Sequence, residues 1–143
     1  MSSKCFFIAL LVLNVLLTGC KEEEDNNSVV GSWNVLTHEV EQVRGGEVVH
    51  EATYYETGTY QFNSDGTGFI LLDVPVIGLP PDQDILWAED SLGRITINYN
   101  NGTPVHRFDP SYRGEFLLLT GSQFTGTIGN FLITNSEIFF KKN

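Results

Sequence analysis

From Val29 to its end, the chain alternates short apolar or β-branched runs with turn signals, and no amphipathic helical stripe interrupts them. Two of the turns, Ser64-Asp65-Gly66 and Asp90-Ser91-Leu92-Gly93, have residue types that are typical of β-hairpin connections. The expected strands cover residues 30–40, 47–56, 59–63, 67–72, 85–89, 94–99, 105–108, 115–119, 127–134 and 137–141.

These connections are short, so neighbouring strands must be antiparallel, because parallel strands require long crossovers. A set of about eight to ten short strands closes most simply into a barrel, which removes exposed sheet edges and can enclose one small ligand. The sequence therefore predicts a single all-β domain over residues 29–143, folded as a small antiparallel up-and-down β-barrel.

The first residues have the composition of an export signal. Lys4 precedes the apolar run at residues 6–17, which is too short to span a bilayer, since spanning takes about 20 residues. A short apolar run with a positive charge before it and small residues after it is typical of a signal peptide. We expect residues 1–19 to be that peptide.

Leu17-Thr18-Gly19-Cys20 resembles the lipobox of bacterial lipoproteins. The resemblance implies cleavage between Gly19 and Cys20 and acylation of the Cys20 thiol, which would anchor the protein to a membrane without spanning it. The alternative is an ordinary secretory signal in which the cysteine is incidental.

Residues 20–28 contain a charge run without apolar anchors, which predicts a solvated, flexible tether. The run also resembles the lipoprotein export signal of Bacteroidota, and this implies the outer face of the outer membrane; the alternative is a periplasm-facing position. The residues of this expected signal are Lys21, Glu22, Glu23, Glu24 and Asp25.

Charge and cysteine content exclude several functions. The formal net charge is −10, and removing Lys4 with residues 1–19 makes it −11, so phosphate backbones would repel the mature chain. We therefore expect no nucleic-acid partner. Cys5 leaves with the signal peptide and Cys20 carries lipid, so neither a disulfide nor a cysteine metal site is expected.

Several motifs resemble the short lipocalin-like domains of exported Bacteroidota lipoproteins. Val30-Gly31-Ser32-Trp33 is similar to the Gly-x-Trp strand that opens lipocalins, and residues 60–68 (YQFNSDGTG) are similar to a central hairpin. Leu86-Trp87 with residues 93–97, and residues 137–142, are also similar. The resemblance covers residues 30–142 and implies a lipocalin-like barrel. The chain has no room for the helix of a full lipocalin, so no specific lipocalin ligand follows.

The sequence contains no catalytic or metal-binding signature, and we expect neither enzyme activity nor a cofactor. His38, His50 and His106 lie on different strands without ligand spacing, which favours scattered surface or half-buried histidines. Asn63-x-Asp65-Gly66 lacks the other acids of a calcium loop and is interpreted as a turn. Asp90-Ser91-Leu92 resembles the Bacteroidota O-glycosylation motif, which makes Ser91 a candidate modification site.

The loop at residues 74–81 is apolar and contains three prolines, although loops are usually polar. It is either a plug in one barrel end or the rim of a pocket. If it is a rim, it supplies the apolar lining of a site for a small apolar or amphipathic molecule. The alternative is a protein- or glycan-interaction module with a filled barrel. The candidate ligand-binding residues are Trp33, Tyr54, Tyr55, Ile77, Leu79 and Trp87.

Overall fold

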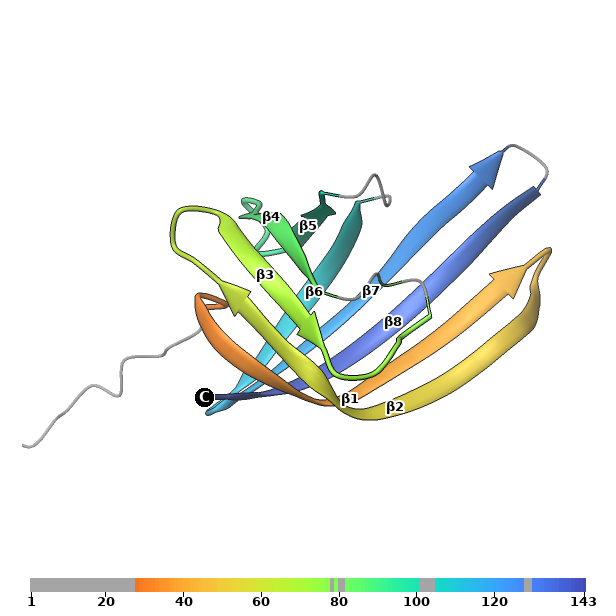
Figure 1. Ribbon diagram of the computed structural model, residues 1–143. Helices are drawn as coiled ribbons and strands as arrows, with labels where there is room; N and C mark the ends of the chain where they lie inside the picture. The colour runs from red at the N-terminus through yellow and green to blue at the C-terminus, as the bar shows by residue number, and fades with distance from the viewer. Residues whose placement is uncertain (1–27, 78, 80–81, 101–104, 128–129) are drawn as a thin grey trace, which may run out of the picture.

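The computed structural model describes residues 28–77, 79, 82–100, 105–127 and 130–143. Eight antiparallel strands follow one another around a closed barrel, and β8 pairs with β1 (Figure 1). Their bounds are β1 (Gly31–Arg44), β2 (Glu47–Phe62), β3 (Thr67–Leu72), β4 (Gln83–Glu89), β5 (Ile95–Tyr99), β6 (His106–Arg113), β7 (Phe116–Thr127) and β8 (Asn130–Lys142). The predicted all-β up-and-down barrel is confirmed.

Two of the eight strands each unite two of the runs expected from the sequence. Runs 47–56 and 59–63 join in β2, and the run 137–141 joins most of the run 127–134 in β8. In β2 the chain bends instead of ending: Glu56, whose φ is 48°, and Thr57 lie opposite the single residue Leu36 of β1. In the pairing of β1 with β8, Leu36 is itself the extra residue. Such a β-bulge increases the local bend and twist of a strand without ending it.

Gly58 follows the bulge and cannot carry a side chain. Its φ is +143°, and a Cβ there would lie 1.9 Å from the backbone oxygen of Leu71 on the neighbouring strand. The close approach lets β2 leave the bulge and pair with β3 at once.

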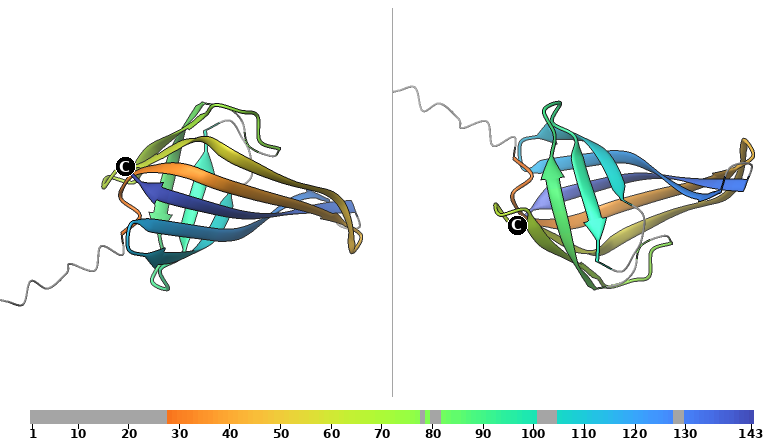
Figure 2. Two further views of the ribbon diagram at one scale, coloured as in Figure 1. Left: turned by 90° about the horizontal axis from the view of Figure 1, so that it is seen from below. Right: turned by 90° about the horizontal axis from the view of Figure 1, so that it is seen from above.

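The barrel has two different ends. At the closed end, Asn143 N donates a hydrogen bond to Ser32 O (3.0 Å) and Lys142 N donates one to Glu115 O (2.8 Å), so the start of β1, the last residues and the β6–β7 turn meet there. At the flared end, the hairpins β1–β2 and β7–β8 project beyond the shorter strands (Figures 1 and 2). The apolar core lies toward the closed end.

Aromatic side chains fill that core. Trp33 is 1% exposed, and its Nε1 donates a hydrogen bond to Val29 O at 2.7 Å. Tyr60 packs edge-on against Phe140, with ring centroids 5.1 Å apart. The closed half of the barrel is therefore packed with side chains around Trp33.

The loop between β3 and β4 is held at both ends by hydrogen bonds: Asp73 N donates to Thr57 O (2.8 Å) and Leu72 N donates to an Asp82 carboxylate oxygen (3.2 Å). Val76 and Leu79 are buried members of the core cluster, whereas Ile77 is 40% exposed. The loop is thus partly plug and partly rim.

Candidate functional site

The inward side chains of β1, β8 and β7 change from apolar to polar along the barrel axis. Strand register places Val35, Phe140 and Leu117 opposite one another near the closed end, all of them buried. Moving toward the flared end, the inward rows on β1, β8 and β7 are, in order, His38–Ile138–Leu119, Val40–Ser136–Gly121 and Gln42–Thr134–Gln123.

The last of these rows continues onto β2 and β6 with polar residues, whereas the β5 residue opposite His106 is the buried Ile97. His50 on β2 lies opposite Gln42, His106 on β6 hydrogen-bonds with Gln123, and Tyr99 on β5 contacts His106. We call this set the polar belt; it consists of His50, Gln42, Thr134, Gln123, His106 and Tyr99. Four of the six, Tyr99, His106, Gln123 and Thr134, are at most 4% exposed.

Hydrogen bonds connect part of the belt. The Tyr99 hydroxyl and His106 Nδ1 are 2.7 Å apart, and Gln42 Nε2 donates to Thr134 Oγ1 at 3.5 Å. Other polar atoms in this region have no partner among the described residues: both ring nitrogens of His38, Nε2 of His50 and the hydroxyl of Tyr60. Buried polar groups usually have a hydrogen-bond partner, so these atoms are available to a bound molecule or to water.

His38 lies two rows below the belt and is fully buried. Its ring meets that of Tyr54 edge-on, with centroids 6.5 Å apart. Burial, together with a smaller effect of the neighbouring His106, lowers the pKa of His38 to about 4. His38 is therefore neutral at pH 7 and offers one N–H donor and one acceptor.

Burial also lowers the pKa of His106 to about 4, although its hydrogen bond with Gln123 acts in the opposite direction. Burial raises the pKa of the Tyr99 and Tyr60 hydroxyls, so both stay protonated. His38, His106, Tyr99 and Tyr60 are consequently uncharged at neutral pH. They place hydrogen-bond donors and acceptors inside the barrel.

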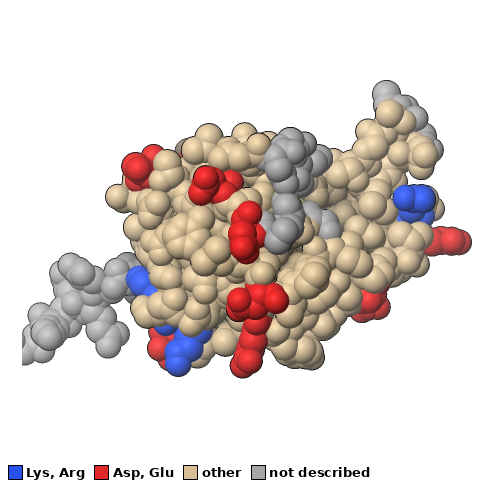
Figure 3. All heavy atoms as spheres, in the orientation of Figure 1, with Lys and Arg blue, Asp and Glu red and all other residues tan. Residues whose placement is uncertain are grey.

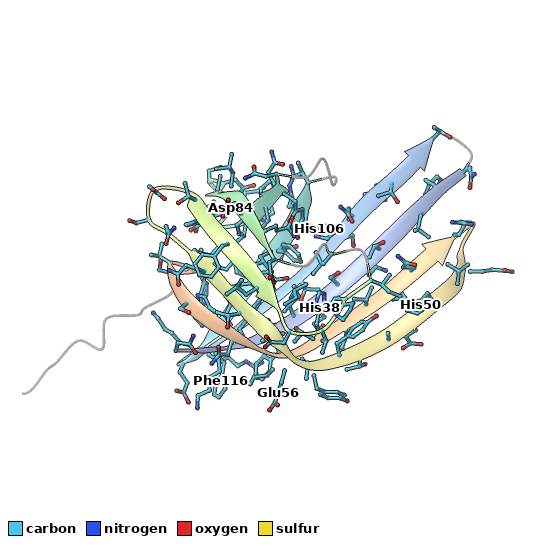
Figure 4. The ribbon with its side chains drawn as sticks, viewed as in Figure 1. His38, His50, Glu56, Asp84, His106 and Phe116 are labelled. Atoms are coloured by element: carbon cyan, nitrogen blue, oxygen red, sulfur yellow. The ribbon has the colours of Figure 1, made fainter. Side chains whose placement is uncertain are left out.

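Figure 4 shows His38, His50 and His106 on the inner side of the strands that carry them. The expectation of scattered surface or half-buried histidines is therefore correct for the half-buried His50 and wrong for His38 and His106, which are buried because strand alternation points them inward. Among the residues that the structure describes, no group of three or more His, Cys, Asp or Glu could hold a metal ion. The arrangement suits hydrogen bonding to a polar group of an organic molecule.

The predicted ligand-binding residues do not converge on one site. Trp33 and Leu79 belong to the core, and Trp87 Nε1 donates to Asn63 O and Thr67 O (both 3.0 Å), which fixes the β2–β3 turn. Tyr55 is 70% exposed on the outer face, so it does not line the interior.

Two of the candidates, Tyr54 and Ile77, do lie near His38, beneath the polar belt. The Tyr54 hydroxyl accepts a hydrogen bond from Ile77 N at 3.4 Å, and the Tyr54 ring contacts His38. The half-exposed residue Ile77 therefore lies beside Tyr54, which in turn contacts the buried His38.

Sequence reasoning missed most of the belt, although β8 carried a signal for it. Counting by twos from the inward residues Phe140 and Ile138 leads to Ser136 and Thr134, two polar residues at inward positions. On β1 the same count fails because the extra residue Leu36 reverses the alternation between Val35 and His38.

A second feature lies on the outer face. An open hollow with a volume of about 920 Å³ crosses β2, β1, β8, β7 and β6. Outward carboxylates meet directly across strands there, Glu41 opposite Glu51 and Glu39 opposite Glu137. Asn135 donates a hydrogen bond to Glu41 (2.8 Å) and accepts one from Ser122 (2.7 Å), which fixes this carboxylate in place.

Several predicted sites lie outside the described residues or remain predictions. The signal peptide, Cys20 and the run from Lys21 to Asp25 fall in residues 1–27, which the structure does not describe. Ser91 lies exposed in the β4–β5 turn, and its O-glycosylation stays a prediction. Asn63-x-Asp65-Gly66 forms a hairpin turn with a Gly66 φ of +83°, as expected. In the described part of the chain there is no helix with the length and apolarity to cross a bilayer.

Comparisons with known proteins give no further guide to the site. No protein family matches the chain, and neither does any curated protein or solved structure with which it was compared. The functional argument therefore depends on the geometry.

Proposed function

We propose that the protein is a lipid-anchored binding module, without enzymatic activity, whose barrel takes up a small amphipathic molecule. The observation that carries this proposal is the polar belt, with unpartnered buried atoms of His38 and His50 facing the same interior. A barrel whose only role was structural would be more stable with apolar residues at these positions, because each unsatisfied buried polar group costs about 1–3 kcal/mol.

The chemistry of the region limits the ligand class. The belt contains no carboxylate, so it offers nothing that would compensate a buried cation. Its imidazole, hydroxyl and amide groups fit a hydroxyl, amide or carboxyl group. Ile77 and the half-buried Tyr54 provide apolar contacts beside it. The ligand would thus place its polar group at the belt and its apolar part toward the loop.

The sequence motifs support the anchored location: Leu17-Thr18-Gly19-Cys20 for lipidation, and the acidic run after Cys20 for display on the outer face of the outer membrane, with the periplasmic face as the alternative. The lipocalin-like resemblance of residues 30–142 agrees with a barrel that binds small molecules. The lipid on Cys20 would attach the protein to its membrane.

Titration with a fluorescent fatty-acid analogue tests the binding proposal. Thr134→Val removes one hydroxyl from the belt at nearly constant shape, so we expect affinity to fall about fivefold, the equivalent of about 1 kcal/mol. Tyr55→Ser changes an outward side chain and should leave affinity unchanged. Equal affinity of wild type and Thr134→Val would contradict a role for the belt.

The outer hollow favours a second candidate function, a protein-interaction module. Its facing carboxylates are not part of either ion pair found among the described residues, Arg94–Asp90 and Lys141–Glu115. They would attract a basic segment of a partner protein. Binding of an oligolysine peptide that is lost in Glu39→Gln/Glu137→Gln, and kept in a variant with Asp73→Asn/Asp84→Asn, would support this candidate.

A further inference from the structure

Basic and aromatic side chains share one patch of the outer face at the closed end. Register places Arg113, Phe116 and Lys141 directly opposite one another across β6, β7 and β8. In the next row lie Ser111, Leu118 and Phe139. Phe116 and Phe139 stack with centroids 5.4 Å apart and planes 13° from parallel. We call these six residues the basal patch.

The patch is more open than a packed face. Five of its residues line a hollow of about 210 Å³: Ser111, Arg113, Phe116, Leu118 and Phe139. Phe116 and Phe139 are only half-buried, and the side chain of Lys141 is 49% exposed although its Nζ lies 3.6 Å from Glu115. An aromatic pair between two cations is thus open to solvent on one side.

Charge is unevenly distributed along this face. Arg113 and Lys141 belong to the first outward row at the closed end, whereas two rows farther on the outward residues are Asp109, Thr120 and Glu137. In Figure 3, most Lys and Arg atoms lie at the closed end, with a further group at the flared end, and carboxylates lie beside them and over the middle of the molecule. The basic part of an acidic protein is therefore concentrated near its tethered end.

The chain outside the described residues joins the barrel at this same end. The described chain begins at Ser28, and β1 pairs with β8 from Trp33 and Lys142 onward. Seven residues, 21–27, separate Ser28 from Cys20, and the eight steps from Cys20 to Ser28 span at most about 26–29 Å when fully extended. A lipid on Cys20 would keep the closed end within that distance of the membrane surface.

We propose that the basal patch contacts the membrane surface, with Arg113 and Lys141 on anionic lipid headgroups and Phe116 and Phe139 at the headgroup level. This inference rests on the proposed lipid anchor, but it is independent of ligand binding in the barrel. Basic side chains are attracted to anionic lipids, and aromatic rings favour the membrane interface. The patch lies on the β6–β8 side of the closed end, whereas Asp65 and Asp90 lie in turns elsewhere on that end, so the barrel would lean toward β6–β8.

Two other occupants fit less well. A second copy of the chain has an excess of acidic residues that could neutralise Arg113 and Lys141. It would, however, have to present these acids from a face without basic residues. The chain's own run Glu22–Asp25 could neutralise Arg113 and Lys141, yet it contains no apolar side chain for the Phe116–Phe139 pair. The bilayer surface satisfies both the charges and the rings.

An environment-sensitive dye on a single cysteine tests the contact. The mature lipoprotein with Ser111→Cys, reconstituted in vesicles of phosphatidylcholine and phosphatidylglycerol, should show a blue-shifted emission relative to vesicles of phosphatidylcholine alone. Thr53→Cys, on the outer face of β2 next to the acidic hollow, is the control position and should show the same water-like emission in both. Vesicle flotation, measured on the same samples, reports lipid anchoring separately.

Charge variants complete the test. Arg113→Gln/Lys141→Gln should abolish the shift at Ser111→Cys, whereas Arg44→Gln/Arg107→Gln removes equal charge elsewhere and should preserve it. Circular dichroism confirms folding of each variant. Anchored protein with identical emission at both dye positions would overturn the proposal. A second result would also overturn the proposal. If the dye at Ser111→Cys has a blue-shifted emission in the non-acylated chain without vesicles, and this shift disappears when residues 22–25 are changed to alanine, then the tether occupies the patch.

Discussion

At the scale of single residues, His38 and His106 carry the largest electrostatic consequence of the fold. Both imidazoles are buried, and the pKa of each falls from 6.5 to about 4. Folding therefore favours their neutral form, and the unfolded chain takes up protons first as the pH falls. Stability should be complete above pH 6.5 and decline between pH 6.5 and 4.

Acid sensitivity can be assigned to these residues by substitution. At pH 5 each histidine should reduce the free energy of unfolding by about 2 kcal/mol relative to pH 7. His38→Gln removes one of the two titrating groups, so its loss on going from pH 7 to pH 5 should be about 2 kcal/mol smaller than that of wild type. Urea denaturation at both pH values measures the difference, and equal losses would show that acidic residues control the effect.

Trp33 anchors the closed end through packing. Trp33→Ala should reduce the free energy of unfolding by about 3–5 kcal/mol, because it removes a fully buried aromatic side chain together with its hydrogen bond to Val29. Denaturant melts measure this loss. A loss below about 1 kcal/mol would mean that the core tolerates the cavity, contrary to its tight aromatic packing.

At the scale of elements, the sequence predicts most strands but not how they bend. Turn signals at Ser64-Asp65-Gly66 and Asp90-Ser91-Leu92-Gly93 predict two hairpins correctly. The bulge at Glu56 could not be read in advance, since the chain there also resembles a turn. The irregularity has a large consequence. Leu36, which lies opposite the bulge and is the extra residue in the pairing with β8, decides which side chains of β1 face inward and therefore which of them join the belt.

In the β3–β4 loop, the plug interpretation applies to the buried Leu79 and the rim interpretation applies to the exposed Ile77. Leu79→Ser should reduce the free energy of unfolding by about 2 kcal/mol, because it puts a hydroxyl into the core cluster. Ile77→Ser should change stability by less than about 0.5 kcal/mol, as is usual for exposed positions, while weakening binding of an apolar probe. Urea melts of the two variants and probe titration measure these effects, and equal destabilisation by both substitutions would make the whole loop a plug.

At the scale of the whole molecule, the barrel is organised along one axis. The closed end is apolar inside, carries the basal patch outside and contains the start of the described chain at Ser28, and the polar belt lies toward the flared end. In the proposed orientation, the closed end faces the membrane and the belt opens away from it. The sequence predicts the barrel and its tether, but the belt and the patch depend on register, which alternation alone does not fix once bulges intervene.

Anchoring has its own test. Cys20→Ala should yield a product without lipid, because the thiol that would be acylated is gone. Metabolic labelling with a fatty-acid analogue measures this, and equal labelling of wild type and variant would contradict lipidation at Cys20. Changing Glu22, Glu23, Glu24 and Asp25 to alanine should keep the label but reduce protease accessibility on intact cells.

The central claim is that the belt holds the polar group of a small amphipathic molecule inside the barrel. Native mass spectrometry of protein purified from its own membrane, in parallel with Thr134→Val and Tyr55→Ser variants, tests it most directly. We predict a discrete added mass on wild type and on Tyr55→Ser, with markedly lower occupancy in Thr134→Val. No added mass on wild type, or equal occupancy in all three proteins, would contradict the claim.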